Sequence, residues 1–150
     1  MCQREPLVAL GPVQDISKQP LQHNTPDPER FYDSSYRPVL SAIISEIVVK
    51  EGPMPLSLLA RRVTSLHGWQ RTGRRISEQV RASLGGVEVH HECKVEFLWS
   101  TGSYAERVTY RPGLDRSVRD ISRAEVAALY DANSDFLMSS EDPCLDLARL

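Results

Sequence analysis

The sequence predicts a mainly α-helical fold with a small β-hairpin, in the α+β class. Three segments, 38–51, 56–67 and 72–84, place apolar residues at helical spacing along one face. Two short alternating segments, 87–91 and 95–99, follow directly. Three helices and then a hairpin is the element order of a winged helix, so we expect a winged-helix-like trihelical core plus C-terminal helices.

The first helix is expected to begin near Pro38, which suits a first turn, and to stop before Gly52-Pro53. In the second helix Leu59, Val63 and Leu66 should face inward, while Arg61, Arg62 and Ser65 should face outward. Thr72 is the expected N-cap of the third helix, which should run to Leu84 before a Gly85-Gly86 cap. The expected core consists of Leu40, Ile44, Ile47, Leu59, Val63, Ile76, Val80 and Leu84.

The hairpin is expected to turn at Glu92-Cys93-Lys94. Trp69 begins the turn between the second and third helices, and Trp99 closes the hairpin. Large aromatic side chains commonly fill a small core at both places, although stacking on bases is the alternative. A further helix should follow Ser122-Arg123-Ala124-Glu125, which has the pattern of a capping box.

The chain divides into three expected regions. Residues 1–33 carry five prolines among polar residues and are expected to form an extended leader or linker. Residues 34–100 should form the winged-helix-like domain, and residues 101–150 a C-terminal helical extension. Leu147-Ala148-Arg149 repeats the sequence of Leu59-Ala60-Arg61. The alternative interpretation of the extension is therefore an incomplete second helical repeat.

Composition narrows the class of protein. The 150 residues are 41% hydrophobic and 25% charged, and no apolar run approaches the roughly 20 residues that span a bilayer. We therefore expect a cytoplasmic protein that does not use a membrane. Three widely spaced cysteines do not indicate a disulfide framework.

The sequence offers no chemistry that indicates an enzyme. His90, His91 and Cys93 are close together, but adjacent strand residues point to opposite faces and no second ligand pair accompanies them. No nucleophile elbow or phosphate-binding glycine loop is present. We expect no catalytic residue, no metal and no cofactor.

Positive charge is concentrated on one stretch. Residues 56–85 hold six arginines and a single acid, Glu78, which is +6 − 1 = +5, whereas the whole chain is 18 − 20 = −2. Such a stretch favours contact with the phosphate backbone of a nucleic acid, with DNA as the expected partner. The candidate contact residues are Arg61, Arg62, Arg71, Thr72, Arg74, Arg75, Gln79 and Arg81.

Several motifs together resemble a helicase-associated bacterial domain of unknown function. They lie between Phe31 and Val126, and they are Glu51-Gly52-Pro53-Met54-Pro55, Leu59-Ala60-Arg61-Arg62-Val63, Gly68-Trp69-Gln70-Arg71-Thr72-Gly73-Arg74-Arg75-Ile76, Phe97-Leu98-Trp99 and Asp120-Ile121-Ser122-Arg123-Ala124-Glu125-Val126. That domain is found at the C-terminal end of large proteins with superfamily-one DNA/RNA helicase motors, often beside an endonuclease-like domain.

The resemblance implies an accessory role beside a superfamily-one helicase or nuclease subunit. The chain itself lacks the Gly-x-x-x-x-Gly-Lys-Ser/Thr loop of such motors, so the resemblance does not imply ATPase activity. The expected function is a non-catalytic nucleic-acid-binding module. The alternative is a protein–protein docking module, for which the acidic residues of 101–150 offer a second surface.

Overall fold

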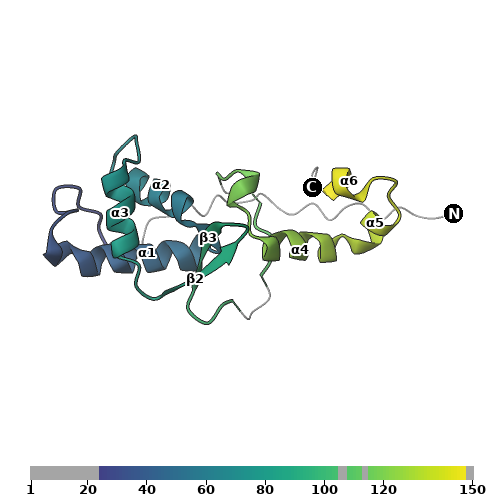
Figure 1. Ribbon diagram of the computed structural model, residues 1–150, viewed down its shortest axis with the longest axis horizontal. Helices are drawn as coiled ribbons and strands as arrows, with labels where there is room; N and C mark the ends of the chain where they lie inside the picture. The colour runs from purple at the N-terminus through teal and green to yellow at the C-terminus, as the bar shows by residue number, and fades with distance from the viewer. Residues whose placement is uncertain (1–23, 105–107, 113–114, 148–150) are drawn as a thin grey trace.

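The computed structural model describes residues 24–104, 108–112 and 115–147. Its body contains three helices, α1 (Arg37–Glu51), α2 (Leu56–Leu66) and α3 (Arg74–Ala82), and an antiparallel sheet of three strands, β1 (Met54–Pro55), β2 (Val87–Glu92) and β3 (Val95–Ser100). Figure 1 shows the C-terminal helices, α4 (Arg123–Ala132), α5 (Ser134–Met138) and α6 (Pro143–Leu147), extending away from this body. The expected mixed α+β fold is confirmed.

The third strand is a feature that the sequence did not reveal. The sheet has the order β1-β3-β2, and Met54 of β1 pairs with Leu98 of β3. Two residues are too few to show an alternating pattern, so β1 looked like a turn. The Met54 side chain of this strand is fully buried. The strand therefore fixes the connection between α1 and α2 to the sheet.

The core lies between the three helices and the sheet. Six of the expected core residues are buried, namely Leu40, Ile44, Ile47, Leu59, Val63 and Val80. The expectation was wrong in degree for Ile76 and Leu84, which pack against the core but are only partly buried. It was wrong for Leu66, which is 36% exposed, because His67 takes the inward position at the end of α2 with 4% exposure.

Helix α3 is shorter than the sequence predicted. Gly73 is its N-cap residue, and the expected cap, Thr72, instead donates its hydroxyl to Thr64 Oγ1 at 3.0 Å. The helix ends at Ala82. The following turn lies close against α1, where a Cβ on Gly85 would stand 2.3 Å from Ser41 Oγ. Gly85 therefore permits a close approach to α1 and does not cap the helix, as had been expected.

The hairpin turn contains two residues. Cys93 and Lys94 have φ values of 46° and 69°, while Glu92 still pairs with Val95. Two consecutive positive φ values match the twist of the flanking strands. The expected turn was therefore one residue too long, since Glu92 belongs to β2.

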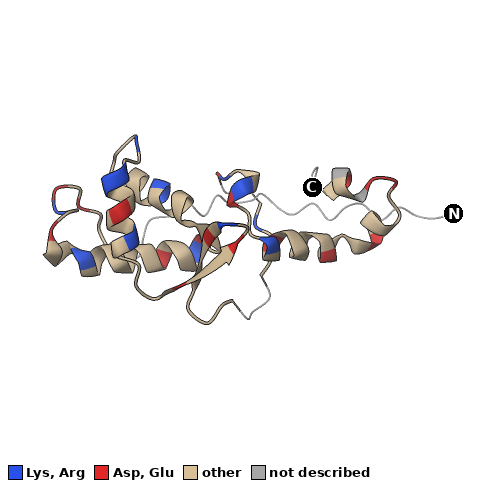
Figure 2. Ribbon diagram, viewed as in Figure 1, with Lys and Arg blue, Asp and Glu red and all other residues tan. Residues whose placement is uncertain are grey.

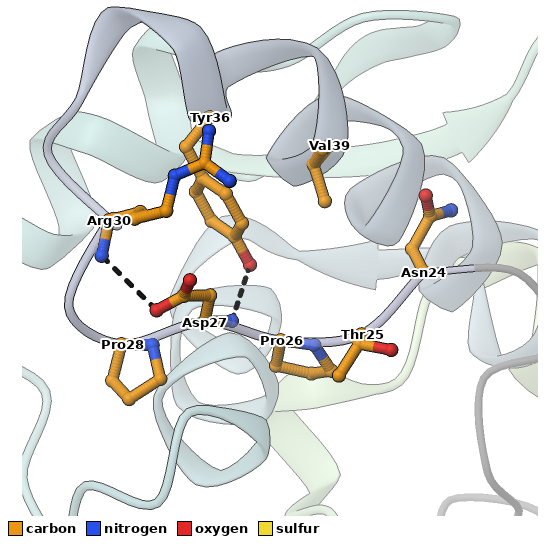
Figure 3. Close-up of a pocket in the computed structure, with 8 residues that line it drawn as sticks. All are labelled: Asn24, Thr25, Pro26, Asp27, Pro28, Arg30, Tyr36 and Val39. Atoms are coloured by element: carbon orange, nitrogen blue, oxygen red, sulfur yellow. Dashed lines mark hydrogen bonds between the residues drawn. The ribbon is translucent and has the colours of Figure 1, made fainter.

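The N-terminal boundary of the packed region is earlier than predicted. Phe31 is fully buried in the core, although it was assigned to the leader that ends at residue 33. As Figure 3 shows, the backbone N–H of Asp27 donates to Tyr36 Oη at 3.0 Å, and the Asp27 carboxylate accepts from the backbone N–H of Arg30. Periodicity could not detect this segment because its packing depends on single side chains.

The C-terminal extension is held to the body by arginine contacts. Arg111 Nη1 donates to the Lys50 carbonyl at 3.1 Å, and Arg62 Nη2 donates to the Asp115 carbonyl at 3.0 Å. At the start of α4, Ser122 Oγ accepts from the Glu125 N–H, as the capping pattern predicted. The second half of the capping box was wrong, because the Glu125 carboxylate accepts from Arg116.

The proposed second repeat is only partly within the described residues. Helix α6 ends at Leu147, and Ala148 and Arg149 lie outside the described part of the chain. Among the described helices, none is both long enough and apolar enough to cross a membrane.

Candidate nucleic-acid interface

Three exposed arginines surround the beginning of α3, and we call Arg71, Arg74 and Arg75 the basic tip. The N-cap residue Gly73 offers no side chain to the first turn, and that turn contains no acid. The positive end of the helix dipole therefore adds to the arginine charges, where acidic side chains would ordinarily be favoured. Figure 2 shows this positive end of α3 at the side of the body remote from the C-terminal helices. Such an end attracts anions.

The partners of the basic tip are weak or exposed. Arg74 Nε lies 2.7 Å from Glu78 Oε1, but the two side chains are 91% and 59% exposed. A solvated pair at this helical spacing contributes only about 0.2–0.5 kcal/mol, so Arg74 can exchange Glu78 for a phosphate at little cost.

Tyr32 belongs to the same surface, and sequence reasoning missed it. The Arg75 guanidinium lies 4.9 Å from the centre of the Tyr32 ring, which is a cation–π contact. Tyr32 is 48% exposed and packs edge-on against Phe31, with 5.1 Å between ring centres. It was overlooked because residues 1–33 were taken for a leader. Its exposed ring provides a surface on which a base can stack.

Arg81 lies on α3 but is directed to the sheet. Both of its terminal nitrogens donate to the Glu96 carboxylate of β3. These hydrogen bonds hold the pKa of Glu96 below its ordinary value. Arg81 therefore has a local partner in β3 and differs from the three arginines of the basic tip.

The two arginines of α2 each form an ion pair with an acidic side chain. Arg62 was expected to face solvent, but its side chain is only 16% exposed, because Nε contacts Glu51 Oε2 at 2.8 Å. Arg61 Nη2 contacts Asp120 Oδ2 at 2.9 Å. Burial raises the pKa of Asp120, yet hydrogen bonds from Ser117 and Arg61 outweigh it and leave that pKa lowered. These arginines join the C-terminal extension to α2.

Thr72 and Gln79 have structural partners. The Thr72 hydroxyl bonds to Thr64, whose own hydroxyl donates to the Ala60 carbonyl of α2. Gln79 Nε2 donates to the Phe31 carbonyl at 3.2 Å. Thr72 thus fixes the turn that carries Arg71, and Gln79 fixes the segment that carries Tyr32. The structure brings together Tyr32 and the basic tip and separates them from Arg61, Arg62 and Arg81.

A buried histidine supports this arrangement. His67 Nδ1 lies 2.7 Å from the Val63 carbonyl, which can only accept, so Nδ1 carries the proton in the neutral ring. Nε2 then accepts from the Tyr36 hydroxyl at 2.9 Å. Desolvation by burial lowers the pKa of His67. Tyr36 in turn holds Asp27, so His67 anchors the segment that leads to Tyr32.

The protein should lose stability as the pH falls below the ordinary histidine value of about 6.5. Because folding lowers the pKa of His67, the unfolded chain takes up a proton at this residue at a higher pH than the folded protein does. The contribution of neutral His67 to the free energy of unfolding is therefore present above about pH 6.5 and is lost as the pH falls below that value. Melting temperatures at pH 7.5 and 5.5 should differ less in His67→Gln than in the parent protein. The variant lacks only His67, so the effect of the other histidines is the same in the two proteins. An unchanged difference would exclude His67 as the source.

Residues 29–78 match the model of a family described as a protein of unknown function (DUF3320). The match begins beside Phe31 and ends within α3, so it includes Tyr32 and the whole basic tip but not Gln79 or Arg81. No curated protein and no solved structure matched the chain. The segment with the shared family pattern is thus the one that builds the candidate interface.

Proposed function

We propose that this protein is a non-catalytic nucleic-acid-binding module that contacts phosphates through the basic tip. The observation that carries the proposal is the clustering of Arg71, Arg74 and Arg75 at the positive end of α3, without a capping side chain or an acid in the first turn. The order α1, β1, α2, α3, β2, β3 supports a winged-helix interpretation, in which α3 is the helix that meets the nucleic acid.

The proposed contact is mainly to the backbone. Arginine can neutralise phosphates without reading sequence, and Tyr32 adds a stacking surface beside Arg75. Arg61, Arg62 and Arg81 take a lesser part because each is paired with an acid that is far less exposed than Glu78, the partner of Arg74. DNA is the proposed partner, and the resemblance noted in the sequence supports work beside a superfamily-one helicase or nuclease subunit.

Removing two charges from the basic tip should weaken binding and its salt dependence. In Arg71→Ala/Arg74→Ala the log–log salt slope for a generic DNA duplex should shrink by about 1.8, at about 0.9 for each neutralised phosphate. Helix α3 should survive because both side chains are exposed and alanine favours helix. Fluorescence anisotropy at several salt concentrations measures the slope.

The matched control is Arg119→Ala/Arg123→Ala, which removes the same charge from exposed positions in the C-terminal extension. Its salt slope should change little. Equal losses in the two double variants would show that binding follows net charge alone. No binding by the parent at low salt, to DNA or RNA, would refute the proposal.

A docking module is the second candidate, and one observation favours it. Helices α4 and α5 expose large apolar side chains, among them Tyr130 at 38%, Phe136 at 55% and Met138 at 78%. Exposed apolar groups on an extended arm are typical of surfaces that meet another protein. Binding of a helicase subunit through this arm should persist at high salt and weaken in Phe136→Ser, whereas binding through the basic tip should be lost with salt.

A further inference from the structure

A pocket lies directly beside the basic tip. It has a volume of about 470 Å³, and its lining comes from α2, from the turn between α2 and α3 and from Asp115. Gln70 and Thr72 belong to that lining, so the pocket begins next to Arg71 in the chain. The volume falls within the range of about 300–1,000 Å³ for sites that hold small organic molecules. A planar ring of the size of a nucleobase therefore has room there.

The pocket offers polar groups that are available to a ligand. Gln70 and Ser65 line it, both are exposed, and neither side chain forms a hydrogen bond with the described part of the protein. The wall beneath them is fixed, because Thr64 is 3% exposed and accepts a hydrogen bond from the Thr72 hydroxyl at 3.0 Å. A glutamine amide both donates and accepts, which suits the edge of a base.

The charges around this pocket favour an uncharged ring over a phosphate. Arg61 and Arg62 line the pocket, but each already forms an ion pair with an acid. Asp115 adds a further acidic residue to the lining. A phosphate is therefore drawn to the exposed arginines of the basic tip, and the pocket is left for the base.

Aromatic contacts connect the pocket to Tyr32. Trp69 lines the pocket and is partly buried against the core. The buried Phe31 ring contacts Trp69 edge-on at 4.9 Å and Tyr32 edge-on at 5.1 Å, measured between ring centres. Tyr32 remains 48% exposed, with the Arg75 guanidinium over its ring. Phe31 thus holds the pocket and an exposed stacking surface at a fixed separation, both next to the basic tip.

We propose that the nucleic acid that binds this surface is single-stranded DNA. The inference rests on the proposed function and specifies its substrate. Phosphates of the strand contact the basic tip, one base stacks on Tyr32 and Arg75, and another base enters the pocket beside Gln70. Paired bases are stacked inside a duplex and reach neither place without leaving the stack. The bases of a single strand are free to do so, and stacking on aromatic side chains along a basic surface is how proteins hold single strands.

The parent protein tests the proposal with two forms of DNA. A mixed-sequence strand of about 12 nucleotides, within the usual site size of single-strand binders, is compared with its blunt duplex at one salt concentration. Fluorescence anisotropy should show the strand binding about tenfold tighter or more. Equal binding of the two forms, or tighter binding of the duplex, would overturn the inference.

Tryptophan fluorescence reports on the pocket in the same titration. Trp99 is 1% exposed, so quenching by a bound strand should come from Trp69, the other tryptophan of the chain. The quenching should be absent in Trp69→Phe at a saturating strand concentration. Quenching that persists in this variant, or none in the parent, would contradict the entry of a base into the pocket.

Two tyrosine variants test the stacking surface. Tyr32→Leu removes the aromatic ring and keeps an apolar contact with Phe31, so strand binding should weaken about fivefold or more and duplex binding little. Tyr130→Leu makes the same change at a half-exposed position of α4 and should affect neither. Equal losses in the two variants, or a Tyr32→Leu loss that is the same for strand and duplex, would reject the stacking role. The comparison of strand and duplex in the parent protein stands independently of any effect on folding.

Gln70→Ala tests the polar edge of the pocket. Strand binding should weaken about threefold or more, as for one lost hydrogen bond, while duplex binding stays unchanged. An unchanged affinity for the strand would remove Gln70 from the site.

Failure of this inference differs from failure of the proposed function. Duplex binding that depends on the basic tip, without a preference for the single strand, would reject single-stranded DNA and leave the proposed function in place. Binding of neither form would reject both.

Discussion

Val80→Asp is expected to unfold the three-helix body. Val80 lies in the second half of α3 and is fully buried in the core, and an aspartate there would have no partner. Burying an unpaired carboxylate costs several kcal/mol, which is a large share of the 5–15 kcal/mol that stabilises a typical domain. Thermal and urea unfolding followed by circular dichroism should show the cooperative transition lost or shifted to far lower temperature.

Val49→Asp is the matched control for this prediction. It is the same substitution on α1, at a valine that is 67% exposed. Surface changes of this kind usually alter stability by less than about 0.5 kcal/mol. Similar melts for Val80→Asp and Val49→Asp would mean that α3 does not pack against the core as described.

Glu125→Gln should also destabilise the protein strongly, by about 3–5 kcal/mol. The Glu125 and Arg116 side chains are 0% and 3% exposed, and their closest contact joins Oε2 to Nη2. Glutamine keeps the shape but removes the negative charge that Arg116 and Arg111 both contact in a poorly solvated site. The loss should appear in chemical unfolding and as faster hydrogen exchange of the α4 amides.

Two comparisons separate this effect from ordinary surface pairing. Glu78→Gln removes the exposed partner of Arg74 and should cost less than about 0.5 kcal/mol. Arg116→Met/Glu125→Leu should be less destabilising than Glu125→Leu alone, because the apolar pair leaves one buried charge fewer. A loss below about 1 kcal/mol in Glu125→Gln would show that the extension is not held by this pair.

The sequence by itself determined the three helices and the hairpin, because their signals are local. The apolar spacing in α1 and the alternation in β2 depend only on nearby residues, as does the Ser122 cap of α4. The expected alternation of β3 was wrong, because Phe97, Leu98 and Trp99 are all buried. The exposed position of Arg74 and Arg75 followed from the same helical geometry. The concentration of positive charge in residues 56–85 was visible because it is a property of one contiguous stretch of sequence.

Only the tertiary structure decided which arginines are available and what else lies beside them. Arg61 meets Asp120, which is 59 positions away, and Gln79 meets Phe31 across 48 positions. Such pairs are set by how elements pack, and no local period records them. The strand β1, the burial of Phe31 and the place of Tyr32 beside Arg75 arise in the same way. Local patterns specify the elements of this protein, whereas long-range contacts specify which of its charges face solvent.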